Sequence, residues 1–299
     1  MKIAILADIH ANAAALQAVR ERVVEAGVQG VWFLGDAVGR GPDPLEVISW
    51  LRECIHSHPE SEWVLGNHDC MLANLLNKEQ WSRVNPSPRL IIERHRAIVA
   101  GDPLALDFVQ QAFNAGRIEP RLRTQSGVNY FLVHGGQVDK AGYYRYVYGW
   151  YTENFMPAEF ERLEALSEDV GGPCVQLYGH THVPALIAGL RTSGGWQIDV
   201  IKVRPGKTYF LDPGYFWIVN PGSVGQPRDK DRRAAYALLD TTEHTIRFER
   251  VEYNWRETAR KMILEHYPVR LVEILKQATP DEHTPDEWLE HYDRVKAMG

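Results

Sequence analysis

The chain has 299 residues, of which 44% are hydrophobic and 24% are charged. This balance is typical of a folded globular protein and excludes long disordered segments. The formal net charge of −6 at pH 7 weighs against a nucleic-acid partner, because surfaces that bind nucleic acids are normally basic.

The sequence contains no signal for a membrane or for secretion. No apolar run approaches the roughly 20 residues that a membrane span needs, so no membrane partner is expected. The first residues predict a strand that ends at Asp8, without the apolar core and cleavage site of a signal peptide. Cys54, Cys70 and Cys174 stand far apart, which predicts reduced and mostly buried thiols. We therefore expect a cytoplasmic protein.

The first third of the chain alternates strand and helix signals. The expected strands are residues 3–7, 31–34 and 63–65, and the expected helices between them are residues 13–25 and 44–55. In the second helix Leu45, Ile48, Leu51 and Ile55 recur near helical spacing, which predicts one buried face. This β-α-β-α-β order favours parallel pairing, in which the carboxyl end of each strand opens onto a ligand-binding loop.

The remaining two thirds change from helical to β signals. Residues 70–127 are expected to be mainly helical, and residues 129–133 and 175–178 to be strands. After Pro184 we expect strands at 197–203, 208–211, 217–219, 235–239 and 245–251, then helices from Trp255 onward with a separate amphipathic helix at 285–298. The aromatic run 143–151 could stack a nucleobase or pack on the protein, and packing is favoured because stacking needs exposed ring faces.

Five polar clusters each follow directly after a predicted strand. They are Asp8-Ile9-His10, Gly35-Asp36, Gly66-Asn67-His68-Asp69, His134-Gly135-Gly136 and Gly179-His180-Thr181-His182. Parallel strands direct their last residues toward one crevice, so we expect the clusters to converge. Carboxylate oxygens and imidazole nitrogens suit zinc, manganese and iron, and two such ions can share one carboxylate, for which we predict Asp36. We expect Asp8 and His10 to point to the same side of an extended chain, and likewise His180 and His182.

The ordered set D-I-H, G-D-A-V-G-R-G, G-N-H-D, H-G-G and G-H-T-H resembles the calcineurin-like metallophosphoesterase superfamily, and N-P-G-S-V-G-Q-P-R at 220–228 resembles its YfcE-like bacterial branch. The resemblance implies an α/β fold, a two-sheet β-sandwich flanked by helices in four αββα layers. We expect one domain at 1–254 with an insertion at about 139–172, and a helical C-terminal extension at 255–299 packed on the same domain. The resemblance, which covers residues 1 to about 240, also implies the metal ligands. One metal ion would be held by Asp8, His10, Asp36 and His182, and the other by Asp36, Asn67, His134 and His180.

The predicted function is that of a dinuclear metal-dependent phosphoesterase that hydrolyses a phosphodiester or nucleotide-type substrate through a metal-bridging hydroxide. The expected cofactors are two divalent ions, manganese first and iron or zinc as alternatives. The expected partner is a small phosphorylated substrate, with nucleotides included, and the oligomeric state is not predicted. His68 is the candidate acid, and Asp69 is expected to hold its imidazole ring. Arg40 either clamps the phosphate or is a solvated loop residue.

Several alternatives stay open at this point. The same site could serve a phosphomonoesterase, a protein phosphatase or a dinucleoside polyphosphate hydrolase, and the fold could also carry a non-catalytic interaction scaffold. A metallo-β-lactamase-like hydrolase lacks support, because its His-x-His-x-Asp-His cluster is missing. The remaining histidines are expected to be structural or surface residues, namely His56, His58, His95, His244, His266, His283 and His291. Turn formation is the favoured role of Asn220, Ser223 and Arg228, and lining of the pocket is the lesser alternative.

Overall fold

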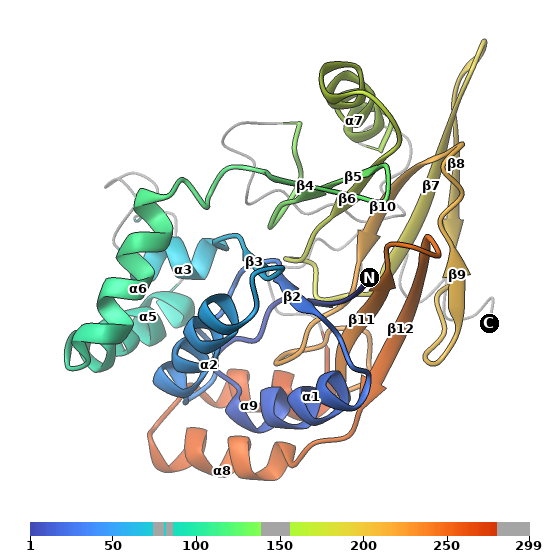
Figure 1. The fold of residues 1–299 in the computed structure, drawn as a ribbon. Helices are drawn as coiled ribbons and strands as arrows, with labels where there is room; N and C mark the ends of the chain where they lie inside the picture. Colours follow the sequence, from blue (N-terminus) through green and yellow to red (C-terminus); the bar gives the residue numbers. More distant parts are fainter. Residues whose placement is uncertain (74–80, 82–85, 139–155, 280–299) are drawn as a thin grey trace.

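Two β-sheets face each other, with helices on both outer sides (Figure 1). The computed structural model describes residues 1–73, 81, 86–138 and 156–279. The aromatic run 143–151, the expected helix at 285–298, His283 and His291 lie outside the described residues. Among the described helices, none is both long and apolar enough to pass through a lipid bilayer.

The first sheet, named sheet A, has the order β3-β2-β1-β11-β12-β9. Its strands are β1 Lys2–Leu6, β2 Gly30–Phe33, β3 Glu62–Trp63, β9 Thr208–Phe210, β11 Ala234–Asp240 and β12 Thr245–Val251. β1, β2 and β3 are parallel, as the β-α-β-α-β order predicts. β11 pairs antiparallel with β1, from Lys2 opposite Asp240 to Ile5 opposite Ala237, so strands from the two ends of the domain share the centre of this sheet.

The second sheet, named sheet B, has the order β4-β5-β6-β10-β7-β8. Its strands are β4 Arg121–Gln125, β5 Val128–Leu132, β6 Cys174–Leu177, β7 Ala185–Thr192, β8 Gly195–Ile201 and β10 Phe216–Asn220. β5, β6 and β10 are parallel, whereas β4, β7 and β8 complete the sheet by antiparallel pairs. Each sheet therefore has three parallel strands whose carboxyl ends can carry ligands.

Side chains that alternate along the strands divide the structure into four layers. Ile3 and Ile5 belong to the core between the two sheets, where the ring of Trp32 lies 5.3 Å from that of Tyr130 across the interface. The intervening side chains of β1 pack in a second core against helices on the outer face of sheet A. Those helices include α1 Ala13–Glu25, α2 Pro44–Ser57, α5 Pro86–Ala100 and α6 Pro103–Asn114, while α7 Met156–Val170 covers sheet B. This αββα arrangement confirms the predicted fold class.

Three elements differ from the sequence-based expectations. β4 lies at the end of the region expected to be helical, and its side chains are at best half-buried, because it is an edge strand. β7 was not expected, although it is buried along most of its length. The segment from Met156 to Val170, within the expected insertion, forms α7, whose Phe160 and Leu163 pack on sheet B.

The helices α3 Asn67–Leu72, α8 Trp255–Leu264 and α9 Val269–Gln277 complete the fold. α8 and α9 form a small core of their own with α5, to which Ile91, Met262, Leu271 and Ile274 contribute. Figure 1 shows α8 and α9 beside α1, on the outer side of sheet A. The end of the described chain is thus packed behind the loops that follow β1 and β2.

Candidate metal centre

The predicted ligands follow the carboxyl ends of strands in both sheets. Asp8 and His10 follow β1, Asp36 follows β2, and Asn67 is the first residue of α3 after β3. In sheet B, His134 follows β5, and His180 and His182 follow β6. The parallel strands bring these loops to one edge of the sandwich, where the histidine and aspartate side chains are all buried.

The loops carrying Asp8, His10, His180 and His182 do not have the extended backbone that the sequence suggested. All four residues have positive φ angles, between 49° and 66°, and so does Asp36 at 59°. A non-glycine residue in this left-handed region is strained by about 1–2 kcal/mol. Backbone hydrogen bonds between the loops after β1 and β2 offset this cost. Asp8 N donates to Gly35 O and His10 N donates to Asp36 O, each at 2.9 Å. The side chains therefore converge because of turns, and the alternation argument was wrong.

Backbone carbonyl groups fix the orientation of three histidine rings. Nδ1 lies 3.0 Å from Val38 O in His10, 2.7 Å from Leu34 O in His134, and 2.6 Å from Gln226 O in His182. Because a carbonyl oxygen only accepts hydrogen bonds, each Nδ1 must carry its hydrogen. In a neutral ring, Nε2 then presents a lone pair, as metal-ligating histidines do.

The spacing of the donor atoms fits ion binding better than hydrogen bonding. Nε2 of His10 lies 3.0 Å from Nε2 of His182, and two lone pairs at this distance have no hydrogen to share. The donor atoms form three groups, and within each group they lie within 4.8 Å of one another. The groups are Asp8 with His10 and His182, His10 with Asp36 and His68, and Asp36 with His134 and His180. The donor chemistry and the spacing thus fit divalent cations.

Asp36 lies between the two halves of this cluster. Its Oδ2 is 3.6 Å from Nε2 of His10 and 3.4 Å from Nε2 of His134. Nε2 of His134 is also 3.1 Å from Asn67 Oδ1 and 3.1 Å from His180 Nδ1. One carboxylate therefore reaches the donors of both expected ligand sets.

Burial dominates the electrostatics of the cluster. It lowers the pKa of His10 and His182 well below the usual value, so both rings are neutral at pH 7. It also raises the pKa of Asp8 to about 8. Burial alone would lower the pKa of His134, but the charge of Asp36 and a hydrogen bond to it raise this pKa to about 9. The protein alone thus holds protons at positions where a cation would replace them.

Asp69 does not hold the His68 ring, contrary to the sequence-based expectation. Its carboxylate accepts backbone N–H hydrogen bonds, at 2.8–3.3 Å, from Asp36, Ala37, Val38 and Gly66. These contacts occupy the carboxylate and fix the loop after β2 against the start of α3. Asp69 therefore organises the backbone around Asp36.

His68 lies beside the cluster and is buried. Its ring is 4.9 Å from that of His10 in an edge-to-face arrangement, and its Nδ1 has no hydrogen-bond partner among the described residues. Burial lowers its pKa to about 3, although the charge of Asp36 acts in the opposite direction. The imidazole is therefore neutral at pH 7 in the protein alone.

The 220–228 loop supports the ligand loops, a role that the sequence analysis missed. Asn220 Nδ2 donates to Gly179 O at 2.8 Å, and Ser223 Oγ donates to Asp8 O at 2.8 Å. Gln226 supplies the carbonyl oxygen that orients His182. The G-S-V-G-Q-P-R signal was visible, but the contact of Ser223 with Asp8 spans 215 positions of sequence, so a turn was the simpler explanation.

Two arginines are buried beside the cluster. Arg40 is 7% exposed and Arg228 only 2%, so Arg40 is not a solvated loop residue. After burial, the charges of both arginines contribute to the lowered pKa values of His68 and His182. Arg228 was not expected at the site, and its charge also lowers the pKa of Asp8. Buried guanidinium groups at this position make the site strongly attractive to anions.

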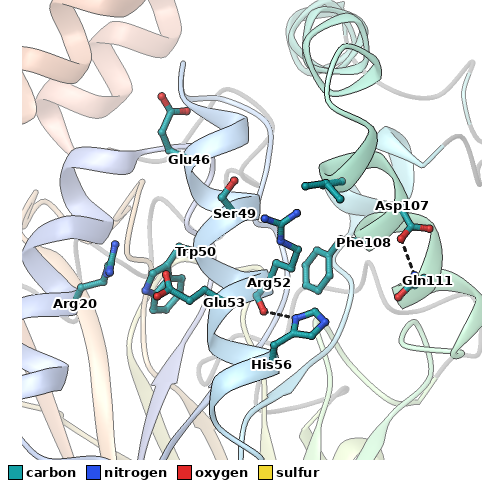
Figure 2. A pocket seen from close by; sticks show the side chains of 11 residues that line it. Arg20, Glu46, Ser49, Trp50, Arg52, Glu53, His56, Asp107, Phe108 and Gln111 are labelled. Atoms are coloured by element: carbon teal, nitrogen blue, oxygen red, sulfur yellow. Dashed lines mark hydrogen bonds between the residues drawn. The ribbon is translucent and has the colours of Figure 1, made fainter.

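A wide surface groove lies away from this cluster. It encloses about 820 Å³ between α1, α2 and α6, and none of the predicted ligands lines it. Figure 2 shows charged side chains of both signs around it, including Arg20, Glu46 and Glu53. Trp50 and Phe108 are nearly buried, so the groove offers little open aromatic surface. The predicted ligands therefore lie in the buried cluster and not in this groove.

Comparison with known proteins agrees with the fold and the motifs. Residues 1–244 match the family model described as calcineurin-like phosphoesterase superfamily domain. The uncharacterized protein MJ0912 of Methanocaldococcus jannaschii is 26% identical over 276 residues, which cover 91% of this chain and 96% of that protein.

Two solved structures are similar over almost their whole length. A metallophosphoesterase from Sphaerobacter thermophilus is 28% identical, with a TM-score of 0.66, covering 93% of this chain and 99% of that chain. The hypothetical protein PH1004 from Pyrococcus horikoshii OT3 is 18% identical, with a TM-score of 0.64, covering 94% and 99%. The second match concerns the fold alone.

Proposed function

Because the chain belongs to the calcineurin-like phosphoesterase superfamily and is a metal-dependent phosphoric ester hydrolase, we propose that it cleaves a phosphodiester or nucleotide-type substrate at a dinuclear centre. One ion would be held by Asp8, His10, Asp36 and His182, and the second by Asp36, Asn67, His134 and His180. The observation that carries this proposal is that Nε2 of His10 and Nε2 of His134 both lie near Asp36 Oδ2, while their Nδ1 atoms contact backbone carbonyl groups.

The donor set suits manganese, with iron and zinc as alternatives. When bound, two divalent ions supply Lewis acidity toward phosphoryl oxygens and a hydroxide nucleophile at neutral pH. Asp36 holds the two halves of the site in register. Asp69 and Ser223 fix the loops that carry Asp36 and Asp8.

The chain's own residues account for substrate binding and proton transfer. Arg40 binds the phosphate of the substrate, and its planar guanidinium group can donate two parallel hydrogen bonds to phosphate oxygens. His68 gives a proton to the leaving oxygen. The charge of a bound phosphate favours protonation of this neutral, buried ring.

A phosphomonoesterase is a second candidate, favoured by a specific observation. Arg40 and Arg228 add two positive charges to the buried site. A monoester or terminal phosphate carries more negative charge than a diester, so it would gain more from this environment. Specificity for the monoester would then depend on both Arg40 and Arg228.

The function is tested by metal content and by matched chromogenic substrates. The manganese-loaded protein is expected to contain two ions per chain by mass spectrometry and to release nitrophenol from bis-nitrophenyl phosphate. Asp36→Ala removes the shared carboxylate, so it should abolish activity and reduce the metal content, whereas Asp107→Ala on the exposed side of α6 should change neither. Nitrophenyl phosphate as a parallel substrate distinguishes the monoester candidate. A fully active protein that binds only one ion would contradict the dinuclear proposal.

A further inference from the structure

Arg40 occupies a backbone conformation that needs external support. Its φ of 62° lies in the left-handed region, which side-chain-bearing residues rarely adopt. The preceding Gly39 also has a positive φ, of 83°, and a Cβ atom there would collide with Nδ1 of His68. Such a conformation persists only where surrounding groups fix it.

His95, on α5, contacts the backbone on both sides of Arg40. Gly39 N donates a hydrogen bond to His95 Nδ1 at 3.2 Å, and His95 Nε2 lies 3.0 Å from Gly41 O. Because Nδ1 accepts, Nε2 must carry the hydrogen and donate it to the carbonyl group. The ring is fully buried and belongs to neither expected ligand set. One neutral imidazole thus fixes both neighbours of Arg40.

Tyr267 adds a second support from the connection between α8 and α9. Its hydroxyl donates a hydrogen bond to Gly41 O at 3.1 Å and lies 3.3 Å from His95 Nε2. The guanidinium group of Arg94 lies 5.0 Å from the centre of the Tyr267 ring, and Arg94 also pairs with Glu265 at 2.9 Å. The contact with Arg94 therefore fixes the Tyr267 ring independently of the hydrogen bond that its hydroxyl donates to Gly41 O.

We propose that His95 and Tyr267 are positioning residues that hold Arg40 in the geometry needed to bind the phosphate of the substrate. The inference rests on the proposed function, because it assigns Arg40 to the phosphate. The family match ends at residue 244, so Tyr267 lies beyond it. The inference therefore gives the segment after residue 244 a role in positioning a substrate-binding residue. A guanidinium group gains its bidentate contact with phosphate only when its direction is fixed in advance.

Binding of inorganic phosphate to the manganese-loaded full chain tests the proposal without reference to turnover. Tyr267→Phe removes one hydroxyl and keeps the ring, so we expect phosphate affinity by calorimetry to fall about 3- to 10-fold, the effect of one lost hydrogen bond. Manganese content should stay unchanged, and the melting temperature should fall no further than in the matched control. Tyr209→Phe is the matched control, because its hydroxyl also donates to a carbonyl group, that of Lys202 at 3.0 Å, but in sheet A.

A double-mutant cycle with Arg40→Ala separates positioning from general structure. In the Arg40→Ala background, Tyr267→Phe should have no further effect on phosphate affinity, because the group it positions is gone. The same cycle with His95→Ala, measured where circular dichroism shows a folded protein, should behave alike. Equal losses with and without Arg40, or unchanged affinity in Tyr267→Phe, would overturn the inference alone. Failure of the wild-type protein to bind phosphate would instead overturn the proposed function and the inference together.

Discussion

At the scale of single residues, His68 combines a buried position with a neutral ring. Its pKa of about 3 results first from burial, with the charges of Arg40 and His134 acting in the same direction. The ring can donate a proton only as imidazolium, so the charge of the bound substrate must first raise its pKa and let it take up a proton from solvent.

His68→Ala is expected to slow turnover by roughly 10²-fold or more while both ions are retained, because the ring lies outside the two ligand sets. Steady-state kinetics and metal analysis on the same preparation measure both quantities. His56→Ala, which removes an exposed histidine of α2, is the control and should behave as the wild type. Loss of an ion in His68→Ala would make His68 a ligand and exclude it as the proton donor.

The sequence was most informative for residues whose chemistry follows a strand. Asp8, Asp36 and His134 could be identified because parallel strands must end at one edge, and the structure brings them together. The contacts of Asp69 and Arg228 could not be predicted in this way. Both depend on which loops meet in space, and loop geometry with positive φ angles is not encoded in hydrophobic periodicity.

At the scale of elements, the turn after β2 tolerates no side chain at Gly35. A Cβ atom at this position would collide with the backbone of Gly66 and with Nδ1 of His134, and φ is 91°. The β2 loop and the loops after β3 and β5 therefore approach one another at a glycine. Gly27, after α1, has a similar positive φ of 64° but open space around it.

We expect Gly27→Ala to destabilise the protein by about 1 kcal/mol, the cost of a left-handed alanine. Gly35→Ala should cost about 3 kcal/mol or more, because backbone atoms must also move. Urea unfolding of the two variants compares these free energies, and Gly35→Ala should additionally lose manganese. Equal destabilisation of both variants would show that the close approach at Gly35 is unimportant.

Sequence patterns predicted the strands with short apolar runs and the helix with an apolar stripe, and they failed for other elements. β1 and β2 have apolar residues in short runs, and α2 has a clear apolar stripe, so all three were found. β4 was missed because an edge strand with Arg121 and Arg123 has no buried face. β7 was missed because alanine and glycine are weak strand formers, and Gly189 is required where the Phe160 ring packs.

At the scale of the whole molecule, the metal centre joins the two sheets. Asp8 and Asp36 extend from sheet A, whereas His134 and His182 extend from sheet B. Ions that bind only the folded protein stabilise it, and ions held by the proposed ligands would also link the two sheets.

This stabilisation should increase with pH. In the ion-free protein the pKa is about 8 for Asp8, raised by burial, and about 9 for His134, raised by Asp36 against the effect of burial. Both groups hold a proton at pH 7 and must release it to bind a cation, so affinity rises as pH approaches 9. We expect manganese to raise the melting temperature more at about pH 8.5 than at about pH 6, with no such difference in Asp36→Ala. An equal rise at both pH values would contradict these protonation states.

The pairing of β1 with β11 also affects the order in which the chain can fold during synthesis. Lys2 lies opposite Asp240, and Ser223 Oγ donates to Asp8 O, so the earliest strand is completed by some of the last residues of the sandwich. During synthesis on the ribosome, β1 leaves the exit tunnel long before its central neighbour exists. Such long-range pairing is slow to form, and apolar surface stays exposed until it does. We therefore expect the loop that carries Asp8 to reach its final geometry only after residues 223–240 have left the ribosome.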